Sequence, residues 1–86
     1  MESVNTEELK EALKETKKHL DGLVHAELYA IREWTKATME LAMVIGQERW
    51  PKVAQFCKSF VRVTELLANV PTKEALRVIE ELHGGE

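Results

Sequence analysis

The segment from residue 23 to residue 45 carries more apolar surface than a helix needs when it packs against one neighbour. At about 100° per residue, its side chains form two stripes with the alternating three- and four-residue spacing of packed helices. The stripes lie about 100° apart, so the apolar arc is roughly twice the usual width, and a helix here needs at least two neighbours. The first stripe is Val24, Leu28, Ile31, Thr35, Thr38, Ala42 and Ile45, and the second is Leu23, Glu27, Ala30, Trp34, Ala37, Leu41 and Val44.

Glycine, proline and threonine residues indicate where the helices begin and end. A glycine costs a helix about 1 kcal/mol relative to alanine, so Gly22 favours a break, although one helix running through it stays an alternative. We expect Gly46 to cap a helix end, Pro51 to occupy a first turn and Thr72 to cap the last helix. The expected helices of this single domain, residues 1–86, cover about 6–20, 23–45, 51–68 and 72–83.

The helix at 51–68 is also broadly apolar, whereas the first and last helices each offer one stripe. A chain of 86 residues has room for only a small core of its own. Large exposed apolar patches on proteins of this kind usually mark interfaces. We therefore expect an all-α, antiparallel bundle of three to four helices completed by oligomerisation, most simply as a dimer. A monomeric four-helix bundle is the alternative. The residues expected in the core or the interface are Leu28, Ile31, Trp34, Leu41, Ile45, Phe56, Phe60 and Leu67.

Glu27 interrupts the second apolar stripe and is a candidate functional polar residue. Its carboxylate could reach solvent at the end of the bundle, or it could pair with a basic side chain from another helix or subunit. A third interpretation is a buried acid with a raised pKa. The sequence leaves the three alternatives open.

Composition limits the classes of partner. The formal charge of −3 is spread along the chain, so no polybasic surface favours nucleic acid. No stretch reaches the roughly 18 apolar residues of a membrane span, and the acidic start does not resemble a secretory signal. The one cysteine, Cys57, is expected to be a buried, unreactive thiol in a cytoplasmic protein. The few Asn and Gln residues hint at a thermophilic source.

Candidate chemistry is sparse, and we expect no catalytic residue, no cofactor and no enzyme. Glu80 and His83 have the Glu-x-x-His spacing of helical metal sites, but such sites need further ligands, so a metal-binding bundle is only an alternative. Residues 66–82 have the cadence of a helix-turn-helix, with Lys73 and Arg77 among the residues that would face DNA. This DNA-binding regulator is a second alternative.

The function that the pattern favours is a non-catalytic interaction or assembly module. It would self-associate through the helices at 23–45 and 51–68, where the apolar surface is widest. The same surface could instead receive a helix from a different protein, since Met39, Met43 and Tyr29 border it.

Overall fold

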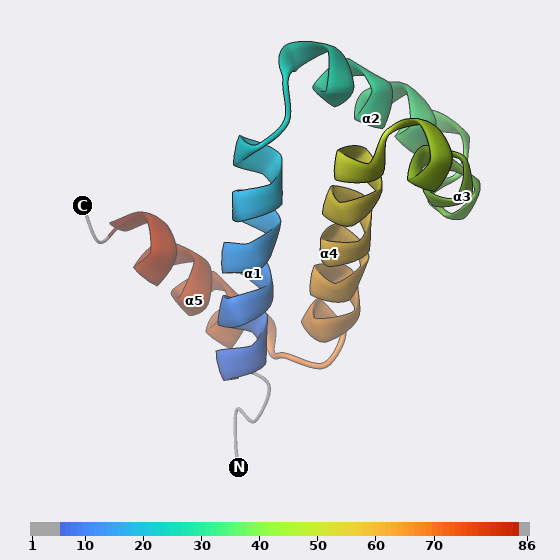
Figure 1. The fold of residues 1–86 in the computed structure, drawn as a ribbon. Helices are drawn as coiled ribbons and strands as arrows, with labels where there is room; N and C mark the ends of the chain where they lie inside the picture. Colours follow the sequence, from blue (N-terminus) through green and yellow to red (C-terminus); the bar gives the residue numbers. More distant parts are fainter. Residues whose placement is uncertain (1–5, 85–86) are drawn as a thin grey trace.

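A computed structural model describes residues 6–84, which form five helices and contain no strand (Figure 1). The all-α class is therefore confirmed. α1 and α4 run side by side in opposite directions, α5 packs against α1, and α2 and α3 pack against α4 on the other side. No helix among the described residues is both long enough and apolar enough to cross a bilayer. The helices are α1 (Thr6–Asp21), α2 (His25–Ala37), α3 (Met39–Arg49), α4 (Pro51–Leu67) and α5 (Thr72–Gly84).

The main core lies where α1, α4 and α5 meet. A single ion pair, from Lys10 Nζ to Glu81 Oε1 at 3.1 Å, also links α1 to α5. A second set of buried residues lies on α3 and α4, where Ala42 and Gly46 accompany Val53, Ala54 and Cys57. All of these buried side chains are aliphatic or small. The residues of the main core are Leu9, Ala12, Val63, Val70, Ala75 and Val78.

The expected helix at 23–45 is two helices, because the chain breaks at Thr38. This residue has extended backbone angles, with φ −158° and ψ 128°, and its side chain makes no capping hydrogen bond. The break turns α3 so that its small residues, Ala42 and Gly46, are buried. The stripes drawn across 23–45 therefore do not continue through Thr38, and the count of three to four helices was too low.

Two expected caps differ from the structure. Gly46 lies inside α3 rather than at its end, and α3 continues to Arg49. At the start of α5, the Pro71 carbonyl accepts the first helical bond, from Ala75 N–H at 2.9 Å, so Pro71 holds the cap position and Thr72 is the first helical residue. The break near Gly22 is present, since α1 ends at Asp21 and α2 begins at His25. Pro51 opens α4 as expected.

Candidate association surfaces

α3 carries apolar residues on two faces. Its buried face carries Ala42 and Gly46, while Leu41, Val44 and Ile45 are 55%, 65% and 41% exposed on the other face. We call these three exposed residues the α3 ridge. A helix that is apolar on both sides normally has partners on both sides. In the part of the chain that the structure describes, one side of α3 has such a partner, namely α4 with the adjoining α2.

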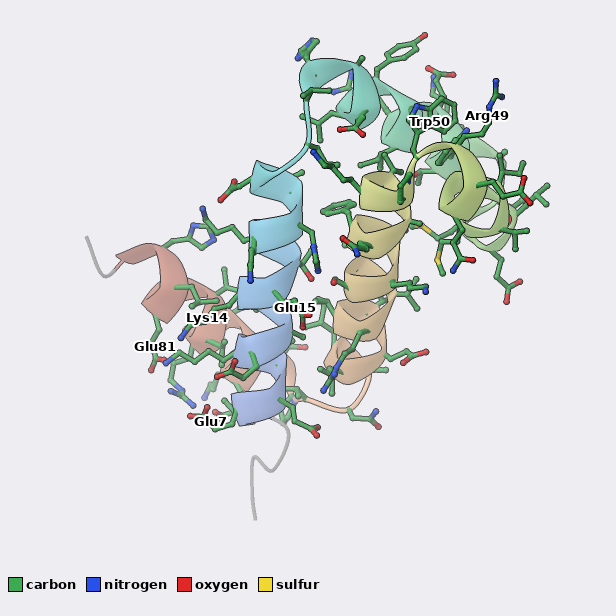
Figure 2. All side chains as sticks on the ribbon, viewed as in Figure 1. Glu7, Lys14, Glu15, Arg49, Trp50 and Glu81 are labelled. Carbon is green, nitrogen blue, oxygen red and sulfur yellow. The ribbon has the colours of Figure 1, made fainter. Side chains whose placement is uncertain are left out.

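A second apolar surface is an open groove bordered by α1, α4 and α5. It has a volume of about 720 Å³, which is within the usual size range of ligand and peptide sites. The groove arises because α5 packs against α1 but points away from it at its end (Figure 1). Charged residues stand among the apolar ones, and Figure 2 labels Lys14 between α1 and α5. The groove is lined by Leu13, Lys14, Thr16, Lys17, Leu20, Asp21, Phe56, Phe60, Val63, Ile79, Leu82 and His83.

Trp34 joins α2 to the junction of α3 and α4. Its ring centroid lies 4.7 Å from that of Trp50 at a tilt of 57°, a favourable aromatic geometry. A Cβ added to Gly46 would lie only 2.9 Å from Trp34 Cζ3, so the missing side chain is what admits the indole. The Arg49 guanidinium lies 5.2 Å from the Trp50 ring, and Figure 2 shows both residues at this junction. Trp34 is thus an anchor within one chain.

Glu27 has a structural role that was not among the three interpretations of the sequence. Its Oε1 accepts a hydrogen bond of 3.1 Å from the backbone N–H of Val24, the residue before α2. Glu27 is the third residue of the helix, where a carboxylate returning to the cap position satisfies an otherwise unpaired donor. The three-residue spacing from Val24 to Glu27 is typical of this cap, but the sequence shows it only when the helix is known to begin at His25.

The eight residues expected in the core or the interface are not in the fully buried core of this chain. Ile31, Trp34 and Phe56 are partly buried. The core instead uses smaller residues, including Val70 in the connection between α4 and α5, which lies outside any helical stripe. That these residues lie in an interface between chains stays a prediction. The five residues of the set that are exposed are Leu28, Leu41, Ile45, Phe60 and Leu67.

The candidate metal and thiol chemistry finds little support within the chain. Among residues 6–84, no group of three or more His, Cys, Asp and Glu side chains is placed to hold a metal ion. Within residues 6–84, Glu80 and His83 therefore have no third ligand of this kind beside them. Cys57 is buried, and burial raises the pKa of its thiol, which keeps it protonated and unreactive.

The segment proposed to read DNA uses its main basic residue in ion pairs. Arg77 contacts Glu74 at 2.7 Å and Glu81 at 3.0 Å, both on α5. Two carboxylates on one guanidinium leave it little net charge to offer a phosphate. The face of α5 that carries Arg77 is therefore acidic in balance.

Comparison of the chain with protein-family models, with curated proteins and with solved structures finds no match. The two surfaces and their chemistry are therefore the basis for a functional interpretation.

Proposed function

We propose that this protein is a non-catalytic assembly module that associates with further copies of itself through the α2–α3 region and α4. The observation that carries the proposal is the α3 ridge, because Leu41, Val44 and Ile45 stand exposed on a short helix whose small residues Ala42 and Gly46 are buried. Exposed aliphatic side chains forgo a stabilising free energy of about 25 cal/mol for each Å² of apolar surface left in water. A partner surface that covers them recovers this free energy.

Light scattering of the purified chain tests the proposal. We expect a mass above the 9.8 kDa of the monomer at micromolar concentration, rising with concentration. Val44→Glu places a charge on the ridge at a side chain that is 65% exposed, so the fold should survive while association weakens. Losing the burial of a valine and adding a charge should raise the dissociation constant at least about tenfold.

The matched control is Leu76→Glu, which makes the same kind of change at an exposed leucine on α5 that neither belongs to the ridge nor lines the groove. It should leave the mass unchanged. A wild-type chain that remains at 9.8 kDa up to hundreds of micromolar would contradict the proposal.

The two alternatives predict different observations. A metal-binding bundle would retain metal through purification and lose it on changing Glu80 and His83. A DNA-binding regulator would bind duplex with an affinity that falls steeply with salt. The acidic pairing of Arg77 with Glu74 and Glu81 favours self-association over the DNA alternative.

A further inference from the structure

We infer that the association is head-to-tail: the α3 ridge of one copy docks into the α1/α4/α5 groove of the next. The inference rests on the proposed self-association and names the two surfaces that meet. They are different surfaces of the chain, so the contact is heterologous and each copy uses one of each.

The ridge has the form of a helix that docks into a groove. Leu41, Val44 and Ile45 have the i, i+3, i+4 spacing of anchor residues on an amphipathic helix. From Leu41 to Ile45 the ridge is about 6 Å long at 1.5 Å per residue. The groove extends along α1 from Leu13 to Asp21, about 12 Å by the same rise. The ridge is therefore short enough to lie within the groove.

The walls of the groove suit such anchors. Leu20 and Phe60 are exposed there, and Phe56 and Phe60 stack with their ring centroids 6.1 Å apart. Ile79 and Leu82 of α5 border the same space. Aliphatic side chains that enter between these aromatic and aliphatic walls would cover apolar surface on both copies.

The charges around the two surfaces are complementary. Glu40 and Glu48 flank the ridge at either end, and both are exposed. Lys14 and Lys17 line the groove, and because Lys17 pairs with its one acidic residue, Asp21, at 3.3 Å, Lys14 supplies the net positive charge. An acidic ridge therefore meets a basic groove, which fixes the orientation of docking and disfavours ridge-to-ridge contact, where like charges would meet.

The positions of the surfaces separate them within one copy. α4 packs against α1 on one side and α3 on the other, so the groove and the ridge lie on different sides of the molecule (Figure 1). Docking leaves a free ridge at one end and a free groove at the other. Further copies then add, and the assembly is a ring or an open chain rather than a simple dimer.

A mixing experiment tests this geometry, with Val44→Glu as the ridge variant and Leu20→Glu as the groove variant. Both sites are exposed, and circular dichroism establishes that each variant is folded. Each variant alone should be monomeric by light scattering. An equal mixture should form a dimer and nothing larger, because only one intact ridge and one intact groove can meet. Leu76→Glu is the control and should assemble like the wild type.

The exposed Lys14 gives a second test that does not alter an apolar side chain. Lys14→Glu should weaken assembly roughly fivefold, as expected for replacing one exposed attraction by a repulsion. Mixing the Lys14→Glu chain with a chain that carries Glu48→Lys beside its ridge should restore part of the lost affinity.

The outcomes separate this inference from the proposal on which it rests. A wild-type chain that is monomeric overturns both. A wild-type oligomer whose mass is unaffected by either Val44→Glu or Leu20→Glu, or a mixture of the two that stays monomeric, overturns the head-to-tail contact and leaves self-association standing. A groove variant that still forms dimers alone would show a contact between like surfaces and would also overturn it.

Discussion

The side chain that Gly46 lacks decides where Trp34 lies. The indole occupies the space beside α3 that a methyl group would fill, at 2.9 Å from Cζ3 and 3.3 Å from Cη2. Trp34 cannot simply retreat, because Trp50 packs against it. Reading the sequence, we expected Gly46 to end a helix, which is the commoner role of glycine. A glycine that is needed for packing leaves no local signal in the sequence, because the residue that requires it, Trp34, lies twelve positions away on another helix.

Gly46→Ala should destabilise the protein although alanine is the better helix former. Overpacking costs about 1–3 kcal/mol, and the gain in helix propensity returns about 1 kcal/mol, so we expect a net loss of about 1 kcal/mol in the free energy of unfolding. Guanidinium denaturation followed by far-ultraviolet circular dichroism measures it. Gly22→Ala is the control: its Cβ would meet His19 O at 3.6 Å and Lys18 O at 3.8 Å, both ordinary contacts, so stability should not fall. Equal stability of the two variants would show that Trp34 gives way easily.

At the scale of the helices, the ends were more predictable than the interior. Gly22, Pro51 and Pro71 act locally, through backbone freedom or a missing N–H, and helix ends lie near all three. Thr38 has no such chemistry and stands in a stretch with strong helix periodicity. The packing of Trp34 on Gly46, with α3 against α4, accompanies the break. A single sequence does not display that long-range contact, so the pattern predicted one helix.

The start of α2 depends on Glu27. Glu27→Ala removes the acceptor for Val24 N–H and a negative charge near the helix N-terminus, so we expect a loss of about 0.5–1 kcal/mol in the free energy of unfolding. Chemical denaturation measures the loss. Glu27→Gln keeps an acceptor oxygen and should lose less than half as much. An alanine variant as stable as the wild type would mean that water satisfies Val24 N–H equally well.

The link between α1 and α5 should make stability depend on pH. The hydrogen bond from Lys10 lowers the pKa of Glu81, with its charge and that of Arg77 acting in the same direction. A carboxyl whose pKa is lower in the folded state stabilises the fold above its unfolded pKa, and this contribution is lost as pH falls through the folded pKa. Glu81 should titrate at lower pH in the wild type than in Lys10→Met when followed by carboxyl chemical shifts. If Glu81 titrates identically in the wild type and in Lys10→Met, the ion pair between Lys10 and Glu81 does not stabilise the fold.

At the scale of the whole molecule, the sequence predicted the surplus of apolar surface but not where it lies. The buried side chains are small, with Leu9, Val53, Val78 and Cys57 the largest that are fully buried. Larger residues such as Leu41 and Phe60 remain exposed, and they divide between a ridge and a groove. A helical stripe shows that a side chain needs a partner and does not show which partner. The groove depends on the angle of α5, which periodicity does not encode.

Self-association should make thermal stability depend on concentration. If only the folded chain assembles, mass action adds stability as concentration rises above the dissociation constant. For a chain of this size, a hundredfold increase in concentration across that range should raise Tm by roughly 5 °C or more. Differential scanning calorimetry measures the shift. Val44→Glu should show a Tm that does not change with concentration, and the same shift in the variant would contradict a role for the ridge.

The tryptophan pair gives the chain an optical reporter of its own. Trp34 and Trp50 are its two tryptophans, and their rings are 4.7 Å apart, close enough for exciton coupling between the indole transitions. Because the sign and strength of that coupling depend on ring separation and tilt, a near-ultraviolet spectrum follows the joint between α2 and the α3–α4 junction without any attached label. The joint's melting can thus be told apart from the loss of helix elsewhere.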